Sequence, residues 1–414
     1  MSTANAVTAV PSIGIAGQTA PARVASIDIF RGLTMAVMIF VNELAEVRGL
    51  PWWTYHAKAS WNVMTYVDMV YPFFLFIVGL AIPLAVRARL KKNPSMPALW
   101  WHVLLRSASL IVLGLILANA EKVDRARTGL SGSAWGVIAL LGGVLFWNVY
   151  PESKRYSVLF RTLRGVGLVL MIAMYAIFRR TTHTSEVAWI DGSYPEILGL
   201  IGYTYLSVTA LYLVTRRWLW APVAWFVALV ALCAVSTLHW LDFPNTLPLY
   251  FWPFSNGSWC CMTMAGVVTS AIFLGDHRWR TASQKMLLAV AFAVPVLAAG
   301  WLLTPLGISK IRATPTWCLY SVGAAVLCFT LLYWICDVKK RTVWARPVRS
   351  AGSNTLLTYL LPDFYAFLIA LTGMVYFETH FHVGWPGAVK SIVFTLVILG
   401  ISALLTRCRL RMQL

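Results

Sequence analysis

The most constraining feature of the sequence is a succession of apolar runs, each close to the length of a membrane span, separated by short polar connections. A helix needs about 20 apolar residues to cross the hydrocarbon core of a bilayer. Hydrophobic residues make up 59% of the chain, charged residues only 12%, and the mean hydropathy is +0.71, which excludes an ordinary soluble domain. We therefore expect an all-α, polytopic integral membrane helix bundle with about 12 transmembrane helices. The runs lie near 27–46, 65–86, 101–119, 132–150, 162–179, 195–215, 218–237, 258–275, 286–303, 315–336, 351–373 and 387–406.

Basic residues alternate strongly in number between successive connections. One set of connections holds Arg87, Arg89, Lys91, Lys92, Lys154, Arg155, Arg161, Arg164, Arg216, Arg217, Arg278, Arg280, Lys285, Lys339, Lys340, Arg341, Arg346, Arg349, Arg407, Arg409 and Arg411. The other set holds only Arg48, Lys58, Lys122, Arg125, Arg127, Arg179, Arg180, Lys310 and Arg312. The positive-inside rule assigns the richer set to the cytoplasm, so both termini are predicted to be cytoplasmic and residues 42–68 to face the other side. The formal net charge of +19 is then a topology signal, and we expect no nucleic-acid partner.

Two further expectations concern the ends and the cysteines of the chain. Residues 1–22 are rich in Ala, Thr, Ser and Gly, and we expect a disordered N-terminal tail followed by one membrane domain over 23–414. The seven cysteines lie mostly within apolar runs and show no metal-ligand spacing. They are predicted to be buried small side chains, with no metal site.

Polar residues at the two ends of the first span call for an explanation, because a charge in a membrane span is costly. Asp28 and Arg31 lie three residues apart at its cytoplasmic start, where they could form an ion pair or where Arg31 could hold an anionic ligand. Asn42 and Glu43 lie at its other end, where they could simply solvate free carbonyl groups or take part in a site.

The connection that follows the first span adds an imidazole, a carboxylate and several aromatic rings. His56 lies among Trp52 and Trp61, which could belong to an interfacial aromatic belt, and Asp68 lies in the first turn of the second span. An amide, an imidazole and a carboxylate are the groups that acid–base chemistry needs: a proton acceptor near neutral pKa, a group to orient it, and a donor for developing negative charge. A solvated loop histidine and a possible catalytic site both remain open on this pattern alone.

The order of these residues resembles a known family. The stretches "SIDIFRGLTMAVMIFVN" (26–42), "HAKASWN" (56–62) and "DMVYPFFLFIVG" (68–79) are similar to motifs of the transmembrane acyltransferase family that includes lysosomal heparan-alpha-glucosaminide N-acetyltransferase and its bacterial N-acetylglucosamine-related membrane relatives. "PEILGLIGYTYL" (195–206) and "YWICDVKKRTVWARPVRSAGSNTLLTYLLPD" (333–363) are similar to further motifs of that family. Two positions depart from the family pattern: Asn62 stands where a glycine is usual, and Leu200 where an arginine is often found.

The resemblance implies that acetyl is transferred from cytoplasmic acetyl-CoA, as donor co-substrate, to the amino group of a glucosamine-type sugar on the extracytoplasmic face. It places the catalytic histidine on His56, the active-site asparagine on Asn42 and the motif aspartate on Asp68. It further implies a homodimer in the lipid of a bacterial inner (plasma) membrane. His56 is then either the base that removes a proton from the amine or a carrier that is itself acetylated, and the sequence does not separate the two routes.

Ligands for the two substrates follow from the same reading. For the phosphate groups of CoA we expect cations near the cytoplasmic side, namely Arg31, Arg87, Arg89, Lys339 and Lys340, although each could equally be a topology signal alone. Asn354 is a further expected cofactor-binding residue. Asn354, Thr358 and Asp363 could line a path for the pantetheine arm. Trp52, Trp61 and Glu43 are the expected substrate-binding residues on the sugar side.

Two other functions fit the same composition. Aromatic-rich entrances also occur in transporters, so the chain could transport N-acetylglucosamine or related oligosaccharides, although the sequence shows no convincing internal repeat. An O-acyltransferase of cell-envelope polysaccharide would share the fold and the base and differ only in its hydroxyl acceptor.

Overall fold

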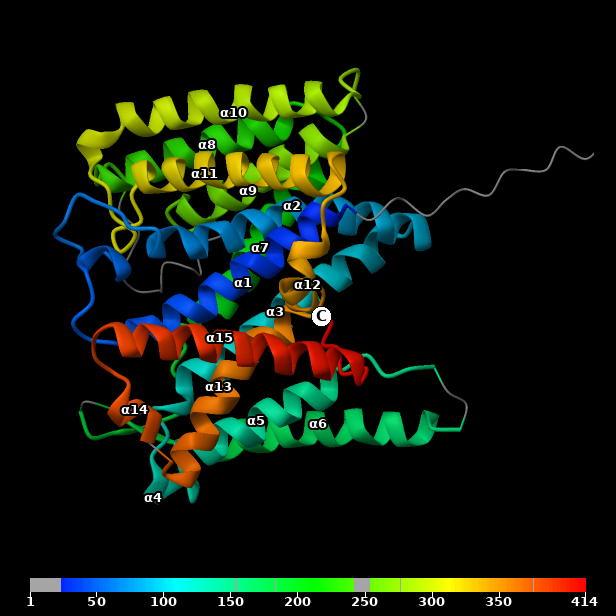
Figure 1. Cartoon of the computed structure of the whole chain (residues 1–414). Coiled ribbons are helices and arrows are strands. Elements are labelled where there is room, and N and C mark those ends of the chain that lie inside the picture. Colours follow the sequence, from blue (N-terminus) through cyan, green and yellow to red (C-terminus); the bar gives the residue numbers. More distant parts are fainter. Residues whose placement is uncertain (1–23, 153–154, 183, 242–253, 276, 375) are drawn as a thin grey trace, which may run out of the picture.

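The structure is a computed structural model that describes residues 24–152, 155–182, 184–241, 254–275, 277–374 and 376–414. The tail predicted for residues 1–22 and Lys154 of the basic set lie outside these residues. Over the described residues the chain is an all-α bundle whose long helices run roughly side by side (Figure 1). The prediction of an all-α helix bundle is confirmed.

The described residues contain a helix in each of the twelve predicted apolar ranges. Nine are long and apolar enough to cross a membrane: α1 (Ala25–Ala45), α2 (Val70–Lys92, extended to Val67 by a 3-10 turn), α3 (Met96–Ala120), α6 (Ser157–Ile177), α7 (Glu196–Thr215), α10 (Ala282–Leu302), α11 (Pro315–Tyr333, extended to Val338 by a π-helical turn), α13 (Thr355–Thr372) and α15 (Gly384–Arg407). Three apolar helices are shorter: α5 (Gly132–Trp147), α8 (Ala221–Thr237) and α9 (Ser258–Leu274). These lengths establish an integral membrane protein, and the number of twelve spans stays a prediction.

Short elements connect the long helices. They are the 3-10 turns η1 (Trp52–Thr54), η2 (Val67–Met69), η4 (Thr304–Leu306) and η6 (Val343–Ala345), the π-helical turn η5 (Trp334–Val338), the helices α4 (Arg125–Thr128), α12 (Arg346–Ser353) and α14 (Tyr376–His380), and the antiparallel strands β1 (Arg180–Thr181) and β2 (Val187–Ala188). The run predicted as one span over 351–373 is divided at Asn354, where α12 ends and α13 begins. The boundary at this position was therefore wrong.

Helices α2 and α9 approach each other at a pair of glycines. A β-carbon added at Gly79 would overlap the carbonyl oxygen of Thr263, and one added at Gly266 would overlap that of Phe76. Helices in a membrane associate through close van der Waals packing, and small residues allow their backbones to come together. The two glycines therefore allow the backbones of α2 and α9 to pack against each other.

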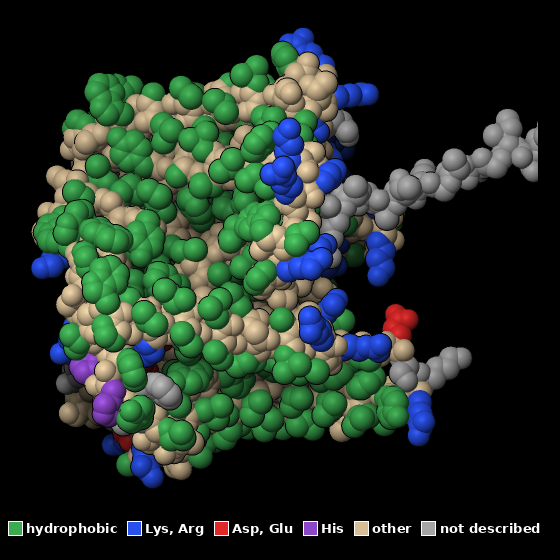
Figure 2. Space-filling model, viewed as in Figure 1, with side chains coloured by type: hydrophobic (Ala, Val, Ile, Leu, Met, Phe, Trp, Pro, Cys, Tyr) green, Lys and Arg blue, Asp and Glu red, His purple; other side chains and the backbone are tan. Residues whose placement is uncertain are grey.

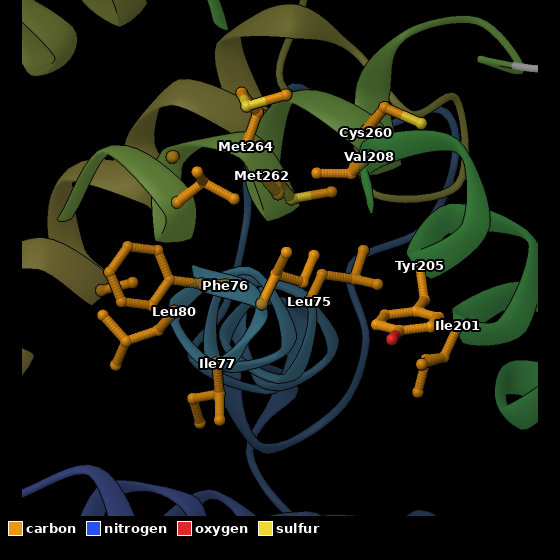
Figure 3. Packing of buried hydrophobic residues seen from close by; sticks show 14 of the residues in the cluster. Leu75, Phe76, Ile77, Leu80, Ile201, Tyr205, Val208, Cys260, Met262 and Met264 are labelled. Atoms are coloured by element: carbon orange, nitrogen blue, oxygen red, sulfur yellow. The ribbon is translucent and has the colours of Figure 1, made fainter. Parts of the chain in front are cut away.

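Large apolar side chains fill the space around this crossing. Figure 3 shows Leu75, Phe76 and Leu80 of α2 directed at neighbouring helices, with Met262 of α9 and Tyr205 of α7 on facing sides. All five side chains are buried. Helix α2 is thus enclosed by its neighbours, which fixes the position of its first turn, where Asp68 lies.

The bundle has two distinguishable ends. One end carries residues 46–66 together with α4 and α14, and is called here the 46–66 end; the opposite end carries α12 and the C-terminus, and is called the α12 end (Figure 1). Figure 2 shows that Lys and Arg side chains gather at the α12 end, while the flanks between the ends are predominantly hydrophobic. This separation of charge from apolar surface is the arrangement expected of a membrane protein.

A long-range contact fixes the start of α1. The carboxylate of Asp337 accepts hydrogen bonds from the backbone amides of Ala25 (2.9 Å) and Ser26 (3.0 Å). The first amides of a helix have no partner within the helix, and a negative charge at that end is favourable. The aspartate of the "CDVK" stretch therefore has a structural function, the capping of the first span by the end of α11.

Cysteine burial follows the prediction in part. Five cysteines are buried and all seven are free, but Cys328 on α11 and Cys408 after α15 are exposed. Apolar spacing alone could not reveal the exposure of Cys328.

Candidate functional site

The 46–66 end brings His56 and Asp68 together. The Nδ1 atom of His56 lies 2.7 Å from Oδ1 of Asp68. The carboxylate is 1% exposed, whereas the imidazole is 41% exposed. A buried acid thus holds one edge of a ring whose other edge faces outward.

The carboxylate of Asp68 has several other donors. Its Oδ2 atom accepts hydrogen bonds from the amide of Thr65 (3.0 Å) and the amide of Ala57 (3.3 Å). The indole of Trp317 on α11 donates to the backbone carbonyl of Asp68 over 3.0 Å, which anchors the same turn from another helix. A buried carboxylate surrounded by donors is suited to the ionised state and to a single orientation.

These contacts determine which ring nitrogen of His56 is reactive. An ionised carboxylate can only accept, so Nδ1 carries the ring proton and donates it to Asp68. The lone pair is then on Nε2, which is free to take a proton or to attack a carbonyl carbon.

The loop that carries His56 is held by its neighbours in sequence. The hydroxyl of Tyr55 donates to the carbonyl of Val47 (2.6 Å) and accepts from the amide of Leu50 (3.1 Å). The hydroxyl of Thr65 donates to the carbonyl of Tyr55 over 2.8 Å. His56 is therefore placed by residues on both sides of it, although it belongs to no helix.

A lysine that no sequence motif singled out lies against the imidazole. The Nζ atom of Lys310, from the connection between α10 and α11, is 3.3 Å from Nδ1 and 3.1 Å from Nε2 of His56. Burial lowers the pKa of Lys310, and the negative charge of Asp68 partly offsets this effect. Lys310 is 254 residues from His56 in sequence, so spacing carried no signal for the contact.

The predicted aromatic substrate residues lie together and in the open. Trp52 and Trp61 form an edge-to-face pair with ring centroids 6.0 Å apart, and they are 54% and 38% exposed. The ammonium of Lys58 lies 5.4 Å from the ring centre of Trp61. Exposed rings beside His56 in sequence offer a surface on which a sugar ring can stack.

Asn42 and Glu43 lie in the last turn of α1 and line a different space. A cavity of about 590 Å³ is bounded by Asn42, Glu43, Glu196, Tyr359, Asp363 and Lys390, among others, but not by His56 or Asp68. Glu43 pairs with Lys390 over 2.7 Å, and the hydroxyl of Tyr359 donates to Glu196 over 2.8 Å. The structure therefore gives no contact between Asn42 and the imidazole that it was expected to serve.

The predicted cofactor cations are distributed over several elements. Arg31 pairs with Asp28 over 3.7 Å and donates to the carbonyl of Gly352 over 3.2 Å, which confirms the ion pair. Arg87 donates to the carbonyl of Leu274 (2.9 Å) and lines a cavity of about 150 Å³ between α2, α7 and α9. Arg89 is exposed at the end of α2.

Lys339 and Lys340 are exposed just beyond the π-helical turn, where Lys339 lies 5.6 Å from the ring centre of Trp334. No described contact brings these cations into one group with Arg31 or Arg87. Their role as cofactor ligands stays a prediction.

Asn354 is fully engaged by the chain itself. Its side-chain amide donates to the hydroxyl of Thr406 (3.0 Å) and to the carbonyl of Leu410 (2.8 Å), and its oxygen accepts from the amide of Met412 (3.1 Å). The side chain is 1% exposed. These bonds give Asn354 a structural function at the α12–α13 junction, and a contact with a cofactor stays untested.

A second group that the sequence reading missed lies on α3. His102 and Arg106 interact electrostatically with each other and with Arg89, and the guanidinium of Arg106 lies 4.8 Å from the ring centre of Tyr205. Among the described residues no hydrogen-bond partner exists for the buried Nε atom of Arg106. The apolar run around α3 concealed these residues, because a span was expected there and its polar positions were not considered.

The two departures from the family pattern also have a place in the structure. The side-chain oxygen of Asn62 accepts a hydrogen bond from Arg312 over 2.8 Å, which ties the His56 loop to the connection that carries Lys310. Leu200 is buried on α7. Within the described part of the chain, no group of three or more His, Cys, Asp and Glu side chains is arranged to hold a metal ion.

Comparisons with known proteins show which proteins the chain resembles. Heparan-alpha-glucosaminide N-acetyltransferase from Mus musculus is 33% identical over 140 residues, which cover 32% of this chain and 21% of the mouse protein. The protein of the same name from Homo sapiens is 38% identical over 99 residues, which cover 24% of this chain and 14% of the human protein. The match therefore spans about a fifth or less of the length of these relatives. The sequence profile described as "Domain of unknown function (DUF5009)" matches residues 23–260, more than half of the chain. The chain belongs to the DUF5009 family.

Proposed function

We propose that the protein is a membrane acetyltransferase that moves the acetyl group of cytoplasmic acetyl-CoA to the amino group of a glucosamine-type sugar on the extracytoplasmic face. The observation that carries the proposal is the His56–Asp68 pair, with its 2.7 Å contact, buried acid and exposed imidazole. The similarity to heparan-alpha-glucosaminide N-acetyltransferases over part of the chain supports it.

The roles of the pair follow from its geometry. An amino sugar attacks a thioester only as the free amine, so a base beside it accelerates the reaction. His56 takes the amine proton on Nε2, and Asp68 keeps the other ring proton on Nδ1. In a second route the Nε2 atom of His56 accepts the acetyl group and passes it to the amine, which needs the same tautomer.

Acetyl-CoA supplies an activated acetyl group and carries several phosphate charges. The donor set around Arg106 on α3 fits such an anion, because the Nε atom of Arg106 is buried without a hydrogen-bond partner among the described residues and Arg106 interacts electrostatically with Arg89 and His102. Arg31, Arg87, Lys339 and Lys340 remain as further candidates for the phosphates.

The acceptor sugar is proposed to stack on Trp52 and Trp61 beside His56. The cavity of about 590 Å³ with Asn42 and Glu43 would receive the remainder of an oligosaccharide. Its carboxylates, including Glu196 and Asp363, suit a cationic amino sugar.

The proposed topology has twelve spans, the α12 end in the cytoplasm and the 46–66 end outside, in the bacterial inner membrane, with residues 23–414 as one catalytic unit and a homodimer as the assembly. The concentration of Lys and Arg at the α12 end supports this orientation (Figure 2). In intact cells, a Lys58→Cys variant should react with a membrane-impermeant thiol reagent. The exposed native Cys408 near the α12 end should react only after permeabilisation and serves as the matched control. The reverse pattern would overturn the orientation.

The activity is tested by incubating the purified protein with acetyl-CoA and following free thiol with glucosamine, chito-oligosaccharide or muropeptide fragments. The expected result is thiol release that depends on the acceptor, with mass spectrometry locating the acetyl group on nitrogen. Product acetylated on oxygen would favour an O-acyltransferase of cell-envelope polysaccharide. The absence of release with every acceptor, together with uptake of N-acetylglucosamine by proteoliposomes, would favour the transporter.

A further inference from the structure

The connection between α10 and α11 places one cation directly on the imidazole of His56. The Nζ atom of Lys310 is nearly equidistant from the two ring nitrogens, at 3.3 Å from Nδ1 and 3.1 Å from Nε2. A donor in the ring plane that was bonded to one nitrogen lone pair would lie well farther from the other. The ammonium therefore lies over the face of the ring, and the lone pair of Nε2 stays available.

The backbone around Lys310 is fixed. The carbonyl of Lys310 accepts from the amide of Ala313 (3.0 Å). Across the turn, the amide of Ser309 donates to the hydroxyl of Thr314 (3.0 Å), and the amide of Thr314 donates to the carbonyl of Ser309 (3.1 Å). Ser309 and Thr314 are both buried. Arg312, in the same turn, donates to Asn62 of the His56 loop over 2.8 Å. The lysine is thus held over the imidazole by a closed turn and by a second contact between the same two segments.

We propose that Lys310 is a further catalytic residue, whose ammonium stabilises the negative charge that develops on an acyl oxygen when the acyl carbon reacts beside Nε2 of His56. This inference rests on the proposed acyl transfer. It adds to that function a residue that lies outside the stretch matched by the family profile, residues 23–260.

The chemistry requires a donor at this place in both routes. When Nε2 attacks the acetyl carbon, an N–C bond forms and the carbonyl electron pair moves to oxygen; that oxyanion then collapses, the C–S bond breaks and the thiolate leaves. Attack by the amine on the acetyl carbon of the acetylated ring forms a second oxyanion. Its collapse breaks the bond between Nε2 and the acetyl carbon and returns the electron pair to Nε2. The proton lost by the amine protonates the thiolate, so charge is conserved. If His56 acts only as a base, the amine attacks the thioester directly and one oxyanion forms. A donor preorganised near the position of that oxygen is worth a large part of such a rate enhancement.

Asn42 was the expected donor, but it lines a cavity that does not include His56. Lys310 lies 3.1 Å from the reacting nitrogen, so an acyl oxygen bound next to Nε2 falls within hydrogen-bond reach of its ammonium. The lowered pKa of Lys310 reflects the burial of this charge in the absence of a full ion pair. An arriving negative charge would supply the missing partner.

The test uses diethyl pyrocarbonate, which transfers an ethoxyformyl group to a neutral imidazole through an oxyanion and needs no acetyl-CoA. In this step Nε2 forms a bond to the carbonyl carbon, and ethyl carbonate leaves as the C–O bond breaks. The full-length purified protein is treated at neutral pH, and modification of the peptide that contains His56 is followed by mass spectrometry. His380, which is exposed at the same end, provides an internal reference rate in each sample.

Lys310→Met should slow modification of His56 by about tenfold or more relative to His380, since one oxyanion donor is commonly worth more than this. Lys310→Arg, which keeps the charge, should restore part of the rate. Lys122→Met removes another lysine of the 46–66 end, one that pairs with Asp191, and should leave the rate unchanged. A Lys310→Met rate that is unchanged or faster would overturn the inference, because it would show that Lys310 only covers the ring.

The same variants are assayed for thiol release from acetyl-CoA. If the wild-type protein releases no thiol with any acceptor while Lys310→Met still slows the modification of His56, the proposed acetyl transfer fails and the role of Lys310 beside the imidazole stands. If turnover is robust and Lys310→Met retains it, the role of Lys310 fails and the proposed function stands. Equal elution of the variants as a single species in size-exclusion chromatography keeps a folding defect from being mistaken for either result.

Discussion

Asp68 and Asn354 are equally buried, and the side chains of both form hydrogen bonds to the backbone. The hydrogen bonds of Asp68 connect it to an exposed side chain, whereas those of Asn354 stay within the protein. Asp68 accepts from the amides of Ala57 and Thr65 and then from His56, whose ring reaches the surface. The side chain of Asn354 bonds to Thr406 and to the backbone of Leu410 and Met412, within the protein. Both positions belong to stretches that resemble motifs of one enzyme family.

The difference teaches how to separate a catalytic polar residue from a structural one in such a motif. Full burial and complete hydrogen bonding are common to both and decide nothing. What distinguishes Asp68 is that the last member of its network, His56, keeps a lone pair on Nε2 and is 41% exposed. We therefore expect changes around Asp68 to affect turnover and changes around Asn354 to affect stability.

The largest effect is expected for His56→Ala. Removal of the group that takes the proton or the acetyl should lower kcat for thiol release by about a thousandfold, within the range for general acid–base catalysis. Because the imidazole contributes little to the buried interior, the melting temperature in detergent should stay close to that of the wild type. Retained turnover would show that His56 takes no part in the reaction. The surroundings of Asp68 would then be purely structural, like those of Asn354.

Asp68→Asn should lower kcat by about a hundredfold. The amide cannot accept from all of the donors around it and would favour the wrong imidazole tautomer, with its proton on Nε2. The effect on turnover should exceed the effect on stability, as measured by thiol release per monodisperse protein and by thermal unfolding. If the variant unfolds at a lower temperature than the wild type but keeps its kcat, Asp68 has a structural function, as Asn354 does.

Asn354→Ala should have the opposite signature. It leaves the carbonyl of Leu410 and the amide of Met412 without their partner, which typically costs about 1–3 kcal/mol for buried groups. Thermal unfolding should move to lower temperature, while kcat of the folded fraction changes less than about threefold. Ser353→Ala, at the adjacent exposed position, is the matched control. A large loss of affinity for acetyl-CoA in a stable Asn354 variant would instead support the predicted cofactor contact.

The sequence predicted the fold more completely than the site. Apolar length and motif order were sufficient for the helix positions and for the pairing of His56 with Asp68, because both depend on residues close together in the chain. The break at Asn354 was missed, since the predicted span over 351–373 included it and the bonds of its side chain go to residues 406–412, far along the chain. Lys310 and Arg106 were missed for a similar reason: one contact spans 254 residues, and the other residue lies inside a run taken for a plain span.

The smallest effect is expected at the sugar platform. Trp61→Ala should raise KM for the acceptor about three- to tenfold with little change in kcat, because an aromatic contact of this kind is worth about 0.5–1.5 kcal/mol. Trp52→Ala should behave in the same way, since the two rings support each other edge to face. Trp101→Ala, an exposed ring on α3, is the control and should leave KM unchanged. An equal effect of all three substitutions would place the sugar elsewhere.

The contact of Asp337 with Ala25 and Ser26 has a consequence for biosynthesis. A ribosome delivers the first span long before the residue that completes its start, because the two partners are separated by 312 and 311 positions. Until α11 has been inserted into the bilayer, the first backbone amides of α1 must form hydrogen bonds with water or lipid headgroups instead. The first helix, and with it the turn that leads to His56, therefore reaches its final position only in the last fifth of translation.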